Sequence, residues 1–455
     1  MAVVQGIDRR RIERLTEREL ARIVDERPRS AELLARGSAS MPRGVPMSWM
    51  TQLYGHPPIF IERGEGAYIT DVDGHRYFDT NIADTSTFCG YSPEPVVRAV
   101  AERIADGAQF LMPTQDAVWV AEELARRWPV PKWQFTLSAT LANTEAIRVA
   151  RHVTGRAKIL MFSGKYHGHA DEMLVIERAG RLEPEYYGLP PSVTEHVVLV
   201  AFNEMEALER ALVPGDVACV LTEPALTNVG VVAPAPGFHA ELRRLTREAG
   251  TLLILDETHT LICGPHGLVG RWSLEPDIVT LGKSIGGGVP IGAYGMTAPV
   301  ARALEDDIAD YGGGNFVPEV ATGGTLFGNA LQMAASRAAL GEMLTAEAYA
   351  RTSALGQRLA DGVDQVAADA GLPWRAHRLF ARSGYAFDGT VARSAADAHR
   401  SHDAELYRLL RLFMVNRGIW EAIEWAGPAV SLAAVAEDVD TYLGVLADLV
   451  EELTA

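Results

Sequence analysis

Two short apolar runs, and the residue that follows each of them, constrain the fold of this chain more than any other feature. Residues 251–255 and 278–281 are rich in Leu, Ile and Val and are too short for helices, which predicts two buried parallel strands. Asp256 follows the first run, and Lys283 follows shortly after the second. Because ligands of open α/β sheets bind at the carboxyl ends of strands, we expect both side chains to share one crevice.

Lys283 is the only lysine after Lys165, and it precedes a run of glycines at 286–288. A lysine in an apolar pocket loses part of its preference for the ammonium form and can condense with an aldehyde as a Schiff base. The glycines would let the backbone lie close to a flat ring. Taken singly, Lys283 could be a loop lysine and Asp256 a helix cap. Their occurrence together with the glycines favours a catalytic site.

The whole stretch from Thr251 to Met296 resembles the class III, fold-type I pyridoxal phosphate (PLP) enzymes, in particular glutamate-1-semialdehyde aminomutase and the omega-amine transaminases. In that family the lysine in the place of Lys283 forms the internal aldimine, and the aspartate in the place of Asp256 pairs with the pyridine nitrogen. The resemblance implies an α/β large domain whose mainly parallel seven-stranded sheet lies between helices. A small α+β domain would come from both ends of the chain. We expect residues 1–80 to contribute to the small domain and to dimer contacts, 81–335 to form the PLP-binding domain, and 336–455 to complete the small domain.

The amino-acid composition limits the kinds of binding partner and the cellular compartment that we expect. The 455 residues are 48% hydrophobic and 22% charged, enough to bury a large core in more than one domain. A net charge of −17 argues against nucleic acid and anionic membranes as main partners. The three unclustered cysteines give no disulfide framework. The first thirty residues lack an apolar signal core, and no apolar run reaches about 18 residues. We therefore expect a cytoplasmic protein.

A candidate phosphate site follows the predicted strand 134–137. Ser138, Ala139 and Thr140 lie between this strand and a segment of helical periodicity, so backbone N–H groups and the positive end of a helix dipole would face an anion. Ser and Thr also cap many helices without binding anything. The family has Ser-Gly-Thr here. Because backbone N–H groups do not depend on the glycine, we expect Ala139 to be compatible with a PLP phosphate.

A second motif, Tyr166-His167-Gly168, follows the predicted strand 158–162 and resembles the family's Tyr-His-Gly. Tyr166 would stack its ring on the cofactor, and His167 would support the site or face the substrate. Without the resemblance, Tyr166 could equally be an interface tyrosine. A zinc site built from His167 and His169 is not expected, because no further His or Cys stands at ligand spacing.

Three further positions are assigned from the resemblance. Glu223, in the Glu-Pro pair after the predicted strand 218–222, would lie near the phenolic oxygen of PLP, although a purely structural carboxylate is an equal alternative. Thr258 stands where the family usually has a valine packed on the ring, and its shape should preserve that packing. Thr325 lies in Gly-Thr-Leu-Phe-Gly-Asn, similar to the phrase whose threonine binds the PLP phosphate of the neighbouring subunit. This implies a homodimer with shared sites. We expect His259, which follows Thr258 in the sequence, to lie within reach of Asp256 or of the pyridine edge of the cofactor.

These assignments predict a transaminase that works by a ping-pong mechanism. PLP supplies the electron sink, and Lys283 would act as general base and then general acid. For the substrate pocket we predict Trp49, Tyr54, Thr85 and Trp420. Because no arginine can be placed there to grip a carboxylate, we expect a hydrophobic or aryl-alkyl amine donor, of (S) type, with a keto acid or ketone acceptor.

Alternatives remain open at this stage. A glutamate-1-semialdehyde-type aminomutase, a β-amino acid aminotransferase and a decarboxylating relative would use the same parts. A non-catalytic PLP-binding protein is more remote, since Lys283 and Asp256 are both present. A nicotinamide-dependent dehydrogenase is not expected, because no Gly-x-Gly-x-x-Gly opens a helix after a first strand.

Overall fold

The computed structural model describes residues 3–4, 6–305 and 320–455. The chain forms two compact units, whose divisions after Pro93 and Ala346 lie beyond the expected limits at 80 and 335. Unit 1 comprises Met1–Pro93, Glu347–Ala392 and Ala396–Ala455, and unit 2 comprises Glu94–Ala346 and Arg393–Ala395. Both ends of the chain therefore belong to unit 1.

Unit 2 is built on a seven-stranded sheet with the strand order β10-β7-β11-β12-β13-β14-β6. Strand β14 runs antiparallel to both of its neighbours, and all the other pairs are parallel. The strands of this sheet are β6 (Lys132–Thr136), β7 (Lys158–Phe162), β10 (Val197–Val200), β11 (Val217–Thr222), β12 (Leu252–Asp256), β13 (Ile278–Gly282) and β14 (Gly292–Met296). A separate hairpin pairs β8 (Val175–Arg178) with β9 (Arg181–Pro184). The predicted α/β architecture with a mainly parallel sheet is confirmed.

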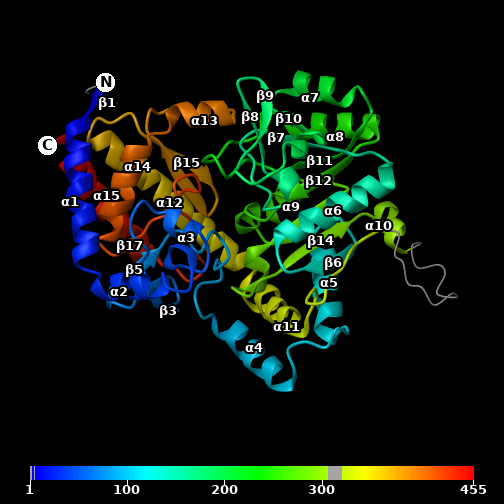
Figure 1. Ribbon diagram of the computed structural model, residues 1–455, viewed down its shortest axis with the longest axis horizontal. Coiled ribbons are helices and arrows are strands. Elements are labelled where there is room, and N and C mark those ends of the chain that lie inside the picture. Colours follow the sequence, from blue (N-terminus) through cyan, green and yellow to red (C-terminus); the bar gives the residue numbers. More distant parts are fainter. Residues whose placement is uncertain (1–2, 5, 306–319) are drawn as a thin grey trace. The chain divides into compact units, whose positions relative to one another are not determined.

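Helices cover both faces of this sheet (Figure 1). Alternate strand residues point to opposite faces, so Ile159 and Met161 of β7 join a buried cluster with Ile147 of α6. The next residue, Phe162, meets Phe238 of α8 on the other face, with ring centres 5.6 Å apart. The helices of this unit are α4 (Glu94–Asp106), α5 (Gln115–Arg127), α6 (Ala139–Thr154), α7 (Met205–Leu212), α8 (Phe238–Ala249), α9 (Gly267–Arg271), α10 (Ala298–Glu305) and α11 (Ala330–Ala338).

The apolar periodicity of residues 330–370 suggests one long helix, and this prediction is wrong. After α11 the chain makes a π turn, Ala339–Met343, and α12 begins only at Ala346. The guanidinium of the buried Arg127 donates to the carbonyl oxygens of Leu340 at 2.7 Å and Leu344 at 2.9 Å. These bonds satisfy backbone groups that the break releases from the helical pattern.

Unit 1 combines a four-stranded sheet, in the order β17-β5-β4-β3, with a hairpin and several helices. The strands of the unit are β1 (Val3–Val4), β2 (Ile7–Asp8), β3 (Ile61–Glu65), β4 (Tyr68–Asp71), β5 (Arg76–Asp79), β15 (Arg375–Leu379), β16 (Arg382–Ala386) and β17 (Ile419–Trp420). The helices are α1 (Arg9–Asp25), α2 (Pro28–Gly37), α3 (Trp49–Gln52), α12 (Ala346–Asp369), α13 (Ala395–Ser401), α14 (Ala404–Val415) and α15 (Ala436–Thr454), where α12 and α13 each begin on a residue of unit 2.

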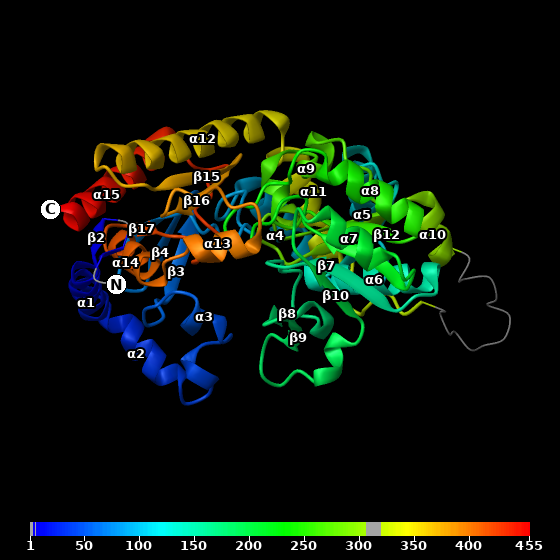
Figure 2. The same ribbon diagram turned by 90° about the horizontal axis from the view of Figure 1, so that it is seen from above.

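Helix α12 lies along the β15–β16 hairpin, as Figure 2 shows. Leu359 and Val363 of this helix join the same buried cluster as Tyr385 and Phe387. The close approach requires Gly356, because a Cβ there would lie 2.0 Å from the carbonyl oxygen of Phe380. No helix within the described residues combines the length and the apolar character that crossing a membrane requires.

Candidate active site

Asp256 and Lys283 emerge at the same edge of the sheet of unit 2. Asp256 is the last residue of β12, and Lys283 follows the last residue of β13. The two strands are parallel neighbours, with Asp256 opposite Thr280. The adjacent carboxyl ends of these strands therefore present a carboxylate and an amine to one side.

Asp256 is buried and receives four hydrogen bonds. Its Oδ1 accepts from the backbone N of Thr258 at 3.0 Å and from the Thr258 hydroxyl at 2.6 Å. Its Oδ2 accepts from Nδ2 of Asn143 and pairs with Nδ1 of His167, both at 2.9 Å. Burial alone would raise the pKa of Asp256, but the partners, led by His167, outweigh it and lower the pKa to about 2. Asp256 therefore stays ionised, and a cationic ring N–H suits it.

Asn143, in the middle of α6, is part of this arrangement and escaped the sequence-based prediction. Its Nδ2 also donates to the carbonyl oxygen of His167 at 2.9 Å, and its Oδ1 accepts from the hydroxyl of Thr280 at 2.6 Å. Every amide atom of this fully buried side chain thus has a role. The signal in the sequence is a polar amide on the apolar face of a helix, which needs partners when it is buried.

Small residues of the neighbouring strands pack closely against the start of α6. Ser138 is the N-cap residue, and its hydroxyl accepts from the N of Leu141 at 3.3 Å. Gly282 and Gly292 lie opposite each other in the sheet. A Cβ on Gly282 would lie 2.9 Å from the Cβ of Ala139, and one on Gly292 only 2.1 Å from the carbonyl oxygen of Ser138. The absence of a side chain at Gly282 leaves room for Ala139 in place of the family's glycine, and its absence at Gly292 leaves room for the Ser138 carbonyl. The first amides of the helix have no intrahelical acceptor.

The side chain of Thr140 takes part in the protein's own packing. Its hydroxyl accepts from the backbone N of His169 at 3.2 Å. The chain can approach this closely because Gly168, with a φ of 108°, has no Cβ to collide with Thr140. Tyr166 stands edge-on to the ring of His169, with centres 6.5 Å apart.

His259 contacts Lys283, a contact that the sequence analysis did not predict. Its Nε2 lies in hydrogen-bond contact with Nζ of Lys283, and its Nδ1 lies 2.9 Å from the hydroxyl of Thr227. Thr227 in turn donates to Oε2 of Glu223. Glu223 is thus connected to Lys283 through two buried side chains.

Thr258 uses the hydroxyl that distinguishes it from the valine usual in the family. Its hydroxyl donates to Oδ1 of Asp256, which a valine could not do. The glycine run after Lys283 also has a local structural role. Gly287 has a φ of 57°, and a Cβ there would lie 2.7 Å from a methyl group of Val96.

The remaining predicted residues are divided between the two units. Thr325 is exposed in unit 2, and its carbonyl oxygen accepts from Nε2 of Gln109 at 2.5 Å. The four predicted pocket residues, Trp49, Tyr54, Thr85 and Trp420, belong to unit 1.

Two of those pocket residues are engaged in packing within unit 1. The rings of Tyr54 and Trp420 have centres 5.2 Å apart. The guanidinium of Arg411 lies 4.2 Å from the first ring centre and 4.8 Å from the second. Trp420 also meets Tyr77 edge-on at 5.8 Å and is only 7% exposed. This aromatic cluster is therefore part of the core of unit 1.

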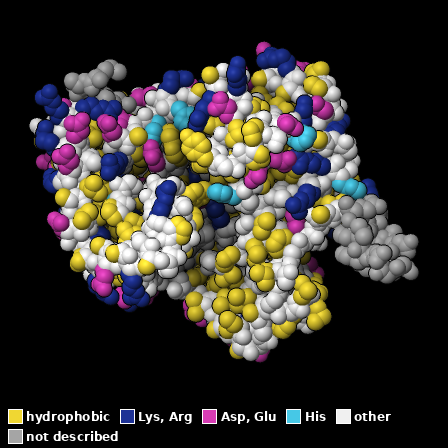
Figure 3. Space-filling model, viewed as in Figure 1, with side chains coloured by type: hydrophobic (Ala, Val, Ile, Leu, Met, Phe, Trp, Pro, Cys, Tyr) yellow, Lys and Arg dark blue, Asp and Glu magenta, His cyan; other side chains and the backbone are white. Residues whose placement is uncertain are grey.

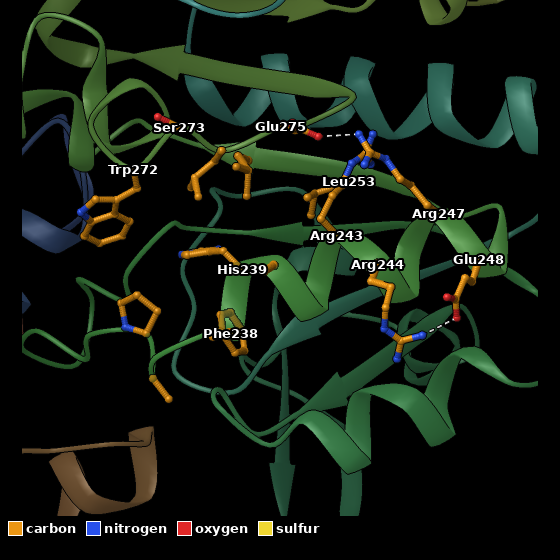
Figure 4. Close-up of a pocket in the computed structure, with 16 residues that line it drawn as sticks. Phe238, His239, Arg243, Arg244, Arg247, Glu248, Leu253, Trp272, Ser273 and Glu275 are labelled. Atoms are coloured by element: carbon orange, nitrogen blue, oxygen red, sulfur yellow. Dashed lines mark hydrogen bonds and ion pairs between the residues drawn. The ribbon is translucent and has the colours of Figure 1, made fainter.

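A cavity of about 790 Å³ in unit 2 is distinct from the predicted site (Figure 4). It lies between α8 and the segment 272–275, and none of the predicted site residues line it. Its three arginines are each paired with a carboxylate, Arg243 with Asp277, Arg244 with Glu248, and Arg247 with Glu275, at 2.6–2.7 Å. Their charges are thus neutralised within the protein.

Comparison with known proteins identifies the family. Residues 50–372 match the family model described as Aminotransferase class-III. The chain belongs to the class-III aminotransferases. Members of this family are PLP-dependent enzymes, so the chain is one as well.

Individual class-III relatives align over nearly the whole chain. A glutamate-1-semialdehyde 2,1-aminomutase of Bordetella avium is 36% identical over 400 residues, which are 86% of this chain and 91% of that protein. A glutamate-1-semialdehyde-aminomutase from Pseudomonas aeruginosa PAO1, solved in complex with PMP, matches with a TM-score of 0.94 and 39% identity over 98% of this chain and 100% of that one. An omega-transaminase from Sphaerobacter thermophilus matches with a TM-score of 0.84 and 29% identity, over 94% and 98% of the two chains.

The described residues of this class-III aminotransferase fit PLP. The ionised Asp256 suits a protonated pyridine nitrogen. The amides at the start of α6, which Ser138 caps, are of the kind that bind a phosphate. Lys283 offers an amine from the neighbouring strand end. When bound, PLP draws electrons away from the bonds at the carbon that carries the amino group.

Proposed function

We propose that this protein is an aminomutase of the glutamate-1-semialdehyde type, which moves an amino group between two carbons of one amino aldehyde. The proposal is supported by relatives of this chain, since the glutamate-1-semialdehyde aminomutases of Bordetella avium and Pseudomonas aeruginosa align over 86% and 98% of it at 36% and 39% identity. The omega-transaminase shares less sequence and a lower TM-score. An aminomutase is also one of the alternatives that the sequence motifs leave open.

In this proposal Lys283 carries the cofactor aldehyde and handles the proton. Displaced by the substrate amine, its Nζ takes a proton from the carbon that bears the amino group and returns it elsewhere on the reacting system. Asp256 holds the pyridine nitrogen in its protonated form, and His167, Asn143 and Thr258 keep Asp256 ionised. The geometry that carries the proposal is the placement of a buried carboxylate and an amine at the adjacent ends of β12 and β13.

Further contacts are assigned on the same basis. The backbone amides from Ser138 to Thr140 bind the phosphate, and Tyr166 supplies a ring face. Glu223 acts through its neighbours near the phenolic side. Trp49, Tyr54, Thr85 and Trp420 remain candidates for substrate contact. The packing of Tyr54 and Trp420 around Arg411, however, does not favour the open aryl pocket expected for a hydrophobic amine.

We further propose that the protein is a homodimer in which Thr325 reaches the phosphate of the partner's site. Apolar side chains gather over α4 and the segment after it (Figure 3). Ile104, Leu111 and Met112 are 60%, 71% and 69% exposed, which is unusual for large apolar groups in one region. Gln109, within the same segment, bonds to the carbonyl of Thr325. A second copy covering this surface would bury it next to Thr325.

Borohydride reduction followed by peptide mapping tests the covalent part of the proposal. We expect the reduced pyridoxyl group on Lys283 and on no other residue. Product analysis with glutamate 1-semialdehyde tests the reaction: an aminomutase needs no added keto acid and yields one isomeric product. A strict requirement for a keto acid, with an aryl-alkyl amine as the preferred donor, would instead establish the transaminase.

The dimer has its own test. Sedimentation should give twice the mass of the 49.3 kDa chain, and Leu111→Asp should shift the protein toward monomer. Thr325→Ala should leave the dimer intact and weaken cofactor retention in both subunits. A monomeric parent protein would refute this part of the proposal without affecting Lys283.

A further inference from the structure

A continuous set of hydrogen bonds connects Lys283, which follows β13, to the buried carboxylate of Glu223, which follows β11. Nζ of Lys283 contacts Nε2 of His259, Nδ1 of His259 lies 2.9 Å from the Thr227 hydroxyl, and that hydroxyl donates to Oε2 of Glu223. Asn228 donates to the other oxygen of Glu223 at 3.1 Å. His259, Thr227 and Glu223 are 6%, 0% and 3% exposed, so these three side chains are shielded from water, and Lys283 is half-buried.

Counting hydrogens along this set fixes the tautomer of His259. Two donors converge on Glu223, which suits an ionised, acceptor-only carboxylate. The Thr227 hydroxyl has a single hydrogen and donates it to Glu223. Its oxygen must then accept from Nδ1–H of His259, and a neutral imidazole with Nδ1–H has its lone pair on Nε2. The lone pair of His259 therefore faces the amine of Lys283.

We propose that His259 is the base that removes the proton from the Lys283 ammonium, and that Thr227 and Glu223 hold it in the competent tautomer. This inference rests on the proposed role of Lys283. An ammonium has no lone pair and cannot attack an aldehyde or accept a proton until it loses one. The arrangement places base, hydroxyl and carboxylate in the order in which a nucleophile is usually activated, with each group oriented by the next.

The proton transfer balances without any further reactant. One N–H bond of Lys283 breaks, and one forms at Nε2 of His259. The Nδ1 proton of His259 moves to the Thr227 oxygen while the hydroxyl proton passes to Glu223, so one proton leaves Nζ and one arrives at the carboxylate. Asp256, three residues before His259, is bound by His167, Asn143 and Thr258. Lys283 and Glu223 are charged groups in direct contact with the His259–Thr227 pair.

The test follows Schiff-base formation when PLP is added to the cofactor-free full-length protein, as a function of pH. In His259→Phe we expect the rate at neutral pH to fall by roughly 10²-fold, the range of a lost general base. We also expect the pH midpoint of the reaction to rise by at least about one unit. Thr227→Val, which leaves His259 in place, should shift the midpoint in the same direction by less, and Thr227→Ser should restore it.

A matched control is Thr222→Val. Thr222 is also buried, but its hydroxyl donates to the backbone carbonyl of Glu223 at 2.9 Å and lies outside the set. Its rate and pH midpoint should equal those of the parent. Thr227→Val tests the proposal even if His259→Phe fails to fold.

The outcomes separate this inference from the proposed function. If borohydride labels Lys283 in the parent, but His259→Phe and Thr227→Val keep the parental rate and pH midpoint, the relay is overturned and Lys283 keeps its role. If Thr227→Val shifts the pH midpoint and Thr227→Ser does not return it to the parental value, the proposed role of the Thr227 hydroxyl is overturned. If the parent protein is not labelled at Lys283, the proposed function itself fails.

Discussion

Asp256 in unit 2 and Asp79 in unit 1 occupy closely similar positions and behave in opposite ways. Each is the last residue of its strand, β12 and β5, and each is almost completely buried. Burial raises the pKa of Asp79 to about 6, whereas the pKa of Asp256 is lowered to about 2 despite the same burial. Depth in the protein therefore does not decide the charge of either carboxylate.

The difference lies in the donors. Asp79 accepts from the hydroxyl of Tyr91 at 2.5 Å and from the backbone N of Asn81 and Ile82 at 2.8 and 2.9 Å. These bonds do not outweigh burial. Asp256 has four bonds, including the imidazole of His167 and the amide of Asn143. The donors around Asp256 keep it ionised, as its proposed role requires, while Asp79 holds the start of a turn.

The comparison predicts that kcat falls most when the charge of Asp256 is removed. Asp256→Asn should lower kcat by roughly 10³-fold, as expected when a group that stabilises developing charge is lost. The matched variant Asp79→Asn should lower kcat by less than about tenfold, because Asp79 supports a turn. Steady-state kinetics with cofactor content measured by absorbance would check both. Similar losses in the two variants would break the distinction between the carboxylates.

A smaller effect is expected when the main partner of each carboxylate is removed. His167→Phe should lower kcat by about 10- to 100-fold, the range for groups that orient a catalytic ligand. Without His167 the pKa of Asp256 rises, so the loss should be greater at pH 5 than at pH 8. Tyr91→Phe, which removes the side-chain donor of Asp79, should leave the pH dependence of kcat unchanged. A loss in His167→Phe that does not vary with pH would assign His167 a purely steric role.

Stability should depend on pH through Asp79 with a predictable sign. Its pKa is about 6 in the folded protein and about 3.9 when unfolded. The favourable contribution of the protonated carboxyl is complete below the unfolded value and is lost as pH rises through 6. Asp79→Asn cannot ionise, so its stability relative to the parent should improve by roughly 1 kcal/mol between pH 5 and pH 7. Urea unfolding at the two pH values measures this, and a pH-independent difference would contradict the raised pKa.

The sequence predicts the strands around the site better than the contacts within it. The apolar runs at 158–162, 218–222, 251–255 and 278–281 place β7, β11, β12 and β13 to within one residue at each end. Such runs succeed because a strand buried on both faces needs apolar residues at every position. The long helix expected over 330–370 failed, because its break depends on Arg127, more than two hundred residues earlier.

The contacts of the site depend on partners that are remote in sequence. Asn143 is drawn into the site by Asp256 and Thr280, more than one hundred residues away. His259 was expected within reach of Asp256 or the pyridine edge of the cofactor. The structure brings its ring to Lys283 and to the Thr227 hydroxyl, two contacts that the sequence did not predict. Periodicity does not encode such pairings, since it reports only which face of an element is apolar.

The smallest predicted effect concerns Thr258→Val, which restores the residue usual in the family. The change removes the hydroxyl that donates to Oδ1 of Asp256 at 2.6 Å but leaves the backbone N–H that donates to the same oxygen at 3.0 Å. Losing one such bond is worth roughly 1 kcal/mol, so kcat should fall by about fivefold or less, with a slightly greater loss at pH 5. Parallel kinetics on His167→Phe set the scale. If the two variants lost equal activity, the hydroxyl would contribute as much as the imidazole to the charge of Asp256, and the contrast with Asp79 would rest on the number of donors rather than on their kind.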